Sequence, residues 1–460
     1  MSFHRMCAAG LVVFGAASLA VACGSTASRP IFDDDASTTG ADGSTVPSDN
    51  DGGGTFDLDS ATSGCPDNSP TKIVGKVYDP AGKNPLYNIQ VYVPSGDLPE
   101  IKSGLPAPKA DGTCQGSTCD SEILSPLAAA LTNTKGEFEL KGPKLFPGKD
   151  VPVVMQIGKW RRKIVIPEVK ACATTTLDKA ITRLPKNGAE GDMPQIALTT
   201  GSFDALECLL TGIGVDPNEF EAGYTSPSKH IHMFKGSGGG NLVNGKNAPE
   251  ASTLWNSVAS MGKYDIAMLS CEGSEALENK PSNLSTMRDY ANAGGRVFTT
   301  HYHYTWMKNN SAWGTGIIDF SSTGTSPSSY PVNTTFPKGQ ALADWLVEVG
   351  ASSSSGTLAL DNVTSSSKGV TSASSPAQEW IGKGSTGKYF SFNTPVGVPV
   401  ADQCGRFVFS DIHSVDFTYA GEDFPVACPA FNASQAVLEY MFFDLSSCVQ
   451  DPTKPPETPK

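Results

Sequence analysis

The chain has 460 residues, of which 39% are hydrophobic, 18% are charged and 8% are aromatic. The hydrophobic and charged shares are low for a globular protein, and the 47 glycines and 33 prolines indicate strands and loops. A coiled coil or a helix bundle would need many more lysine, glutamate and arginine residues. The formal net charge of −13 argues against nucleic-acid binding, and the length predicts more than one domain.

The first 22 residues predict export. Arg5 precedes an apolar run from Met6 to Ala22, which is typical of a secretory signal and short for a spanning helix. Small residues before Cys23 resemble the lipobox of bacterial lipoproteins, although Ala20 stands where leucine is usual. The resemblance implies lipidation of Cys23 and anchoring at the outer membrane or cell surface, with the periplasmic face as another location. Ordinary cleavage beside an incidental cysteine is the alternative.

Residues 23–70 read as a disordered tether. The stretch 24–64 holds eight aspartates against one arginine, with no lysine or glutamate, and offers few apolar side chains for a core. The acidic balance of the chain is therefore mainly a property of this linker. Residues 449–460 predict a second disordered segment.

Nine of the eleven cysteines lie beyond the predicted signal and lipidation site. An oxidising compartment favours pairing, and the odd number predicts at least one free thiol. Proximity suggests three pairs as hypotheses: Cys114–Cys119, Cys65–Cys172 and Cys404–Cys428. A fourth, Cys208–Cys271, would bridge adjacent strand ends.

Residues 71–184 predict a β-sandwich, because short alternating segments are separated by turn signals such as Asp79-Pro80-Ala81-Gly82. The spaced residues of three segments carry a resemblance: Gly75-x-Val77-x-Asp79-x-x-Gly82-x-x-Pro85-Leu86, Val91-x-Val93 and Thr134-x-Gly136-x-Phe138-x-Leu140. Together they resemble the carboxypeptidase regulatory-like domain, with a long insertion over 94–131. The resemblance implies a transthyretin-like, non-catalytic spacer or recognition module; another kind of sandwich is the alternative.

Residues 194–448 change to alternating strands and helices, which predicts a doubly wound, mostly parallel sheet of flavodoxin-like type. The expected strands are 195–200, 230–234, 264–270, 296–300, 388–392 and 406–410. The expected helices cover 203–213, the surroundings of 254–255, 284–290, 338–350 and 434–445. The serine- and glycine-rich region 320–375 reads otherwise as long surface loops.

Three segments of this second domain carry a further resemblance. They are Tyr264–Ser270, AGGRVFTTHYH (293–303) and GRFVFSDIH (405–413), which resemble strands of the class I glutamine amidotransferase-like fold and of its ThuA-like branch. That family places a nucleophilic cysteine just after the strand that here ends at His301. The resemblance therefore implies a degenerate domain that lacks the catalytic cysteine.

Ligands of parallel sheets bind beyond the carboxyl ends of the strands, and histidines gather there in this chain. His301 and His303 alternate by two, so on an extended segment both side chains point the same way. With His413 or Glu272 they would bind zinc or another divalent metal and leave a position for water. A histidine pair packed among aromatic side chains is the alternative.

Two other hypotheses use neighbouring residues. Cys271 follows a buried strand and would act as a nucleophile if a histidine deprotonated it, whereas a Cys208–Cys271 disulfide would remove it. Tyr302, Tyr304 and Trp306, with Ser202 at another strand end, would form a glycan-binding cleft or else a core under the loops.

The sequence thus favours an exported, lipid-anchored surface protein with a binding role, toward a glycan or a surface protein, over an enzyme. The alternative is a metal-dependent enzyme of sugar or amide chemistry that uses His301, His303 and His413.

Overall fold

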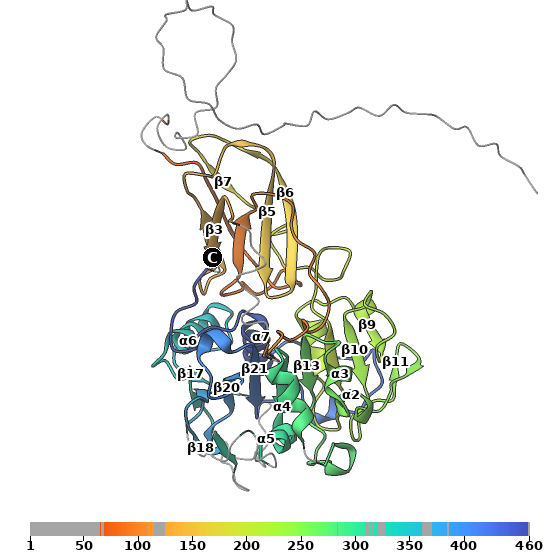
Figure 1. Ribbon diagram of the computed structural model, residues 1–460. Helices are drawn as coiled ribbons and strands as arrows, with labels where there is room; N and C mark the ends of the chain where they lie inside the picture. Colours follow the sequence, from red (N-terminus) through yellow and green to blue (C-terminus); the bar gives the residue numbers. More distant parts are fainter. Residues whose placement is uncertain are drawn as a thin grey trace, which may run out of the picture. The chain divides into compact units, whose positions relative to one another are not determined.

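The computed structural model describes residues 65, 69–111, 113–114, 125–282, 284–308, 313, 317–320, 327–360, 370–383 and 386–458 (Figure 1). These residues belong to one compact unit, Asp57–Lys460. The predicted signal, the lipidation site Cys23 and nearly all of the tether lie outside them. The described helices include none that is long and apolar enough to cross a membrane.

The first seven strands form two antiparallel-rich sheets, which we call the β domain. Their bounds are β1 Lys72–Lys76, β2 Gln90–Val93, β3 Ala128–Leu131, β4 Glu137–Leu140, β5 Gly148–Ile157, β6 Trp160–Val169 and β7 Thr174–Thr176. The three-stranded sheet has the order β4-β1-β7, and the four-stranded sheet has the order β3-β2-β5-β6. Alternate residues such as Ile73, Val91 and Val153 are fully buried in a common core, as the period of a strand requires.

The following elements build an eight-stranded sheet with helices, which we call the α/β domain. Its strand order is β19-β20-β21-β14-β13-β8-β10-β9. The strands are β8 Ile196–Thr199, β9 Phe220–Ala222, β10 Ile231–Phe234, β13 Ile266–Leu269, β14 Arg296–Thr300, β19 Gln378–Ile381, β20 Tyr389–Thr394 and β21 Gly405–Ser410. The pairings from β9 across to β21 are parallel, and only those of β20 with β21 and with β19 are antiparallel. The chain is therefore a multidomain, strand-rich protein, as expected.

The α-helices of the described residues lie on both faces of this sheet. Their bounds are α1 Leu206–Gly212, α2 Ser252–Trp255, α3 Val258–Met261, α4 Ser285–Asn292, α5 Thr305–Lys308, α6 Pro337–Glu348 and α7 Ala433–Ser446. Along β13, Met268 joins the core that contains α1, α6 and α7, whereas Ala267 and Leu269 join the core that contains α2, α4 and α5. Alternation along one strand thus separates two helical layers.

Shorter elements complete the described chain. The strands are β11 Leu242–Val243, β12 Lys246–Asn247, β15 Ile318–Phe320, β16 Tyr330–Pro331, β17 Thr357–Leu358 and β18 Val370–Ala373. The 3₁₀ helices are η2 Pro217–Glu219, η3 Leu277–Asn279, η4 His301–Tyr304, η7 Val400–Asp402 and η8 Phe417–Tyr419. The helix expected over 338–350, within the region 320–375, is present as α6 and buries Leu342, Trp345 and Leu346.

Helix α7 is buried on nearly every side and joins the two domains. Its Glu439 Oε2 accepts a hydrogen bond from Asn84 Nδ2 at 2.6 Å, and Phe442 and Phe443 pack edge-on against Trp160 of β6. One hydrophobic cluster extends from the β domain through α7 to the sheet. The domains therefore share a core instead of being joined only by a linker.

The disulfides correct three of the four predicted pairs. Cys65–Cys172 is confirmed, but Cys114 pairs with Cys404, and Cys208 pairs with Cys428. Proximity along the chain misled the prediction, since these bonds link residues 290 and 220 positions apart. Cys271 is the free cysteine of the described part of the chain, and it is buried.

Candidate functional site

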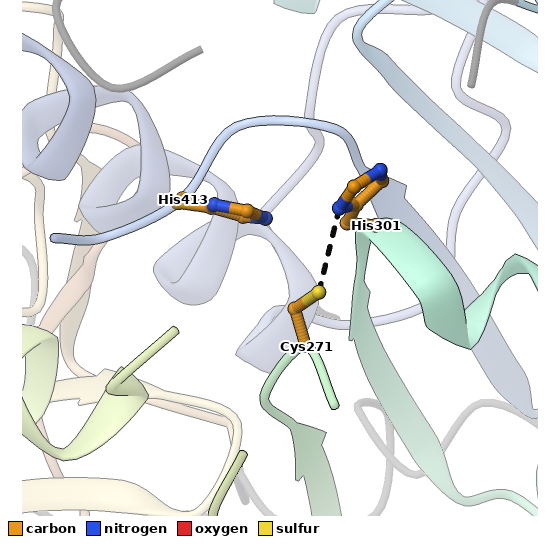
Figure 2. Close-up of side chains that lie close together, drawn as sticks. All are labelled: Cys271, His301 and His413. Carbon is orange, nitrogen blue, oxygen red and sulfur yellow. Dashed lines mark hydrogen bonds between the residues drawn. The ribbon is translucent and has the colours of Figure 1, made fainter. Parts of the chain in front are cut away.

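Three predicted site residues meet at the carboxyl ends of adjacent parallel strands. Cys271 follows β13, His301 directly follows β14, and His413 lies three residues beyond β21. One ligand atom from each residue lies within 4.8 Å of those of the other two. The side chains of Cys271, His301 and His413 face one another across the gap between these strand ends (Figure 2). We call this group the Cys-His-His cluster.

The cluster is closely packed and hidden from solvent. The Sγ atom of Cys271 lies 3.4 Å from Nδ1 of His301, and the two imidazole rings are 5.2 Å apart between centroids. The exposed fractions are 0% for Cys271, 1% for His301 and 3% for His413. Among the described residues, none offers a hydrogen bond to the buried Nε2 atom of His413. An unpaired buried nitrogen is costly, so this atom is available to a ligand that enters the cluster.

The backbone is shaped to bring these side chains together. His301 has a φ of +40°, a left-handed conformation that costs a residue with a side chain roughly 1–2 kcal/mol. This turn ends β14 and starts η4, and it directs the imidazole toward Cys271. A Cβ atom at Gly201 would come within 2.2 Å of the backbone oxygen of Cys271, so only glycine permits this approach.

The environment of Cys271 disfavours a free thiolate. Burial, with smaller contributions from the charges of Asp204 and Asp411, raises the pKa of its thiol to about 12. The nucleophile hypothesis requires a thiolate near neutral pH, so the structure argues against it. The alternative disulfide with Cys208 is also wrong, because Cys208 is bonded to Cys428.

The carboxylate of Asp411 lies behind His301, outside the cluster. The Oδ1 atom of Asp411 lies 3.8 Å from Nε2 of His301, and its Oδ2 atom is 2.8 Å from Nζ of the fully buried Lys388. Carboxylates behind ligating histidines orient the ring and increase its basicity. The sequence predicts a site role for neither Asp411 nor Lys388, although Asp411 lies in the strand-end segment 405–413. Only the fold places the two side chains together.

His303 does not join the cluster, which corrects the predicted metal triad. Its Nε2 atom is 3.0 Å from the backbone oxygen of Ser270, and its Nδ1 atom accepts a hydrogen bond from Trp306 Nε1. Burial lowers the pKa of His303 to about 4. The prediction assumed an extended chain, but residues 301–304 form η4, in which positions two apart face different directions.

Glu272 also lies outside the cluster and binds other protein groups. Its Oε2 atom is 2.5 Å from Nζ of Lys280, and its Oε1 atom accepts hydrogen bonds from Ser237 N and Asn279 Nδ2. Burial alone would raise the pKa of Glu272, but the charges of His303 and Lys280 outweigh it and lower that pKa. This carboxylate is satisfied by the protein and is not available as a metal ligand.

The predicted aromatic cleft is instead largely core. Trp306 is fully buried and Tyr304 is 2% exposed, so neither presents a ring face to a sugar. Tyr302 is half-buried, and Ser202 Oγ donates a hydrogen bond to the backbone oxygen of Glu272. The alternative in which the aromatic rings pack beneath the loops describes them better.

Comparisons of this chain with protein-family models, with curated proteins and with solved structures found no match.

Proposed function

We propose that the α/β domain binds a transition-metal ion of the zinc type through Cys271, His301 and His413. The observation that carries this proposal is the buried convergence of one ligand atom from each residue within 4.8 Å. Thiolate sulfur and imidazole nitrogen are the ligands that zinc prefers in proteins.

The spacing of the two best-placed atoms agrees with this proposal. Zinc–sulfur and zinc–nitrogen bonds of about 2.3 and 2.0–2.1 Å at a tetrahedral angle separate the ligands by about 3.5 Å. The Cys271–His301 separation is 3.4 Å. Three protein ligands leave the fourth position for water. Because all three are buried, the proposed role is metal binding in a closed site and not turnover of a large substrate.

The metal content of the purified, oxidised protein tests this proposal. After zinc loading and dialysis we expect about one zinc per chain, and Cys271→Ser or His413→Ala should retain little of it. His230→Gln is the matched control, because the Nδ1 atom of His230 pairs with Glu219 outside the cluster. Substoichiometric zinc in the unaltered protein, or full retention in both cluster variants, would exclude the site.

We propose further that the protein is exported and lipid-anchored through Cys23. The disulfides Cys65–Cys172, Cys114–Cys404 and Cys208–Cys428 support the first part, because such bonds persist in oxidising compartments. In a bacterial host, we expect labelled palmitate to enter the full chain and Cys23→Ala to abolish the label. Persistence of the label in that variant would contradict anchoring at Cys23.

The family resemblances remain part of this proposal. The position of His301, in a sharp turn directly after β14, supports a degenerate amidotransferase-like domain in which histidine replaces the nucleophilic cysteine. The two sheets of the β domain support a regulatory-like module. A glycan-binding role loses its main argument with the burial of Trp306 and Tyr304.

A further inference from the structure

The segment that carries His413 is held against helix α1 at two places. It runs from Asp411, beyond the end of β21, to Cys428, and we call it the His413 segment. It contains only the short helix η8, so its own backbone hydrogen bonds do not fix His413. Besides the contacts of Asp411 with Lys388 and of Ile412 with Ser410, contacts with α1 and with the loop before it hold the segment directly after His413.

The first attachment is a buried carboxylate. Oδ1 of Asp204 accepts hydrogen bonds from the backbone nitrogen of Ser414 at 2.9 Å and from its hydroxyl at 2.7 Å. Asp204 is 1% exposed, and Ser414 is fully buried. Because Ser414 directly follows His413, this contact fixes the backbone from which the imidazole projects.

The second attachment is covalent. Cys208 of α1 is bonded to Cys428 at the far end of the segment. Between the two attachments, Val415 packs in a small apolar cluster with Ala205, Cys208 and Cys428. The bond therefore closes the segment over α1 and keeps Val415, two residues from His413, in place.

We propose that Asp204 and the Cys208–Cys428 disulfide position His413 for metal binding, so that the metal centre is completed only in the oxidised protein. This inference rests on the proposed metal site. Thiol–disulfide exchange with a small-molecule disulfide oxidises the thiols of Cys208 and Cys428. The bond between their sulfur atoms forms, the disulfide of the oxidant breaks, and the oxidant leaves as two thiols that carry the two protons. Cys271 stays outside this exchange and remains free to ligate the metal.

The test measures zinc affinity by competition with a chelating indicator, and it follows the cysteinate-to-cobalt charge-transfer band after loading with cobalt. Cys208→Ala/Cys428→Ala should bind zinc roughly 10–100-fold more weakly than the unaltered protein, which is the usual effect of losing support behind a ligand. Cys65→Ala/Cys172→Ala, which removes the disulfide of the β domain, is the matched control and should retain the affinity.

Asp204 provides an independent variant pair. Asp204→Ala should weaken zinc binding by a similar factor, and Asp204→Asn should restore most of it because its amide oxygen can still accept from Ser414. If Cys208→Ala/Cys428→Ala does not fold, the comparison of Asp204→Ala with Asp204→Asn tests the inference instead. Unchanged affinity in the folded disulfide variant, or in Asp204→Ala, would overturn the inference and leave the metal site standing. An unaltered protein that binds no zinc would instead overturn the proposed function itself.

Discussion

Replacing Asp444 by alanine is expected to lower the free energy of unfolding by roughly 3–5 kcal/mol. Asp444 lies on α7 and shares its carboxylate between two buried cations, with Oδ1 2.8 Å from Lys338 Nζ and Oδ2 2.9 Å from Arg406 Nη2. Lys338 and Arg406 are each 1% exposed. Burial alone would raise the pKa of Asp444, but the charges of Arg406 and Lys338 lower it, so the carboxylate is ionised. Its removal leaves two uncompensated charges in the core.

Chemical denaturation of the purified protein measures this loss. Asp451→Ala is the control, because the pair of Asp451 with Lys454 is exposed and should contribute less than about 1 kcal/mol. Adding Lys338→Met to Asp444→Ala should recover part of the stability, since one unpaired charge is then removed. A loss below about 1 kcal/mol for Asp444→Ala would show that the two cations are not held by this carboxylate.

A second large effect is expected from pH, through two buried carboxyl groups at the junction of the domains. Burial raises the pKa of Asp79 to about 6 and raises the pKa of Glu439 on α7 well above its ordinary value. The charge of Asp79 raises the pKa of Glu439 further. The folded protein therefore holds protons that the unfolded chain releases near pH 4. The contribution of these two protonated groups to the stability of the folded protein is fully present below about pH 4. It is lost as the pH rises through 6.

Glu439→Gln should remove one of these titrations while keeping an acceptor for Asn84. We expect the variant to match the unaltered protein at pH 4 and to be more stable at pH 8, because glutamine has no carboxyl group that must stay protonated in the folded state. Thermal unfolding at both pH values measures the difference. The exposed Glu348→Gln is the control and should change neither value. Equal stability of Glu439→Gln and the unaltered protein at pH 8 would refute the role of this pair.

The strands of the α/β domain were predictable because burial on both faces gives short apolar runs. Residues 296–300 were expected as a strand and form β14, and the expected strand 406–410 falls within β21. The topology places the ends of these strands side by side, and this is why Cys271, His301 and His413 could be nominated as neighbours. Their residue types alone would not have brought them together.

Which of the nominated residues share the cluster could not be predicted, for two physical reasons. A one-residue change of backbone conformation at His301 turns the chain into η4 and removes His303 from the cluster, and no periodic pattern marks such a turn. The Cys208–Cys428 disulfide joins residues 220 positions apart, so the sequence could not show that Cys208 was already bonded and that Cys271 was free. Both facts depend on tertiary packing.

The central place of the last strand and helix has a consequence for the order of folding. Strand β21 pairs with β14 and β20 within the sheet, and α7 lies in the core that the two domains share. Both are the final regular elements of the described chain, so a ribosome makes them after every strand that they complete. The eight-stranded sheet therefore lacks one of its central strands until residue 410 has been synthesised, and the core shared by the two domains is completed only with the end of α7 at residue 446.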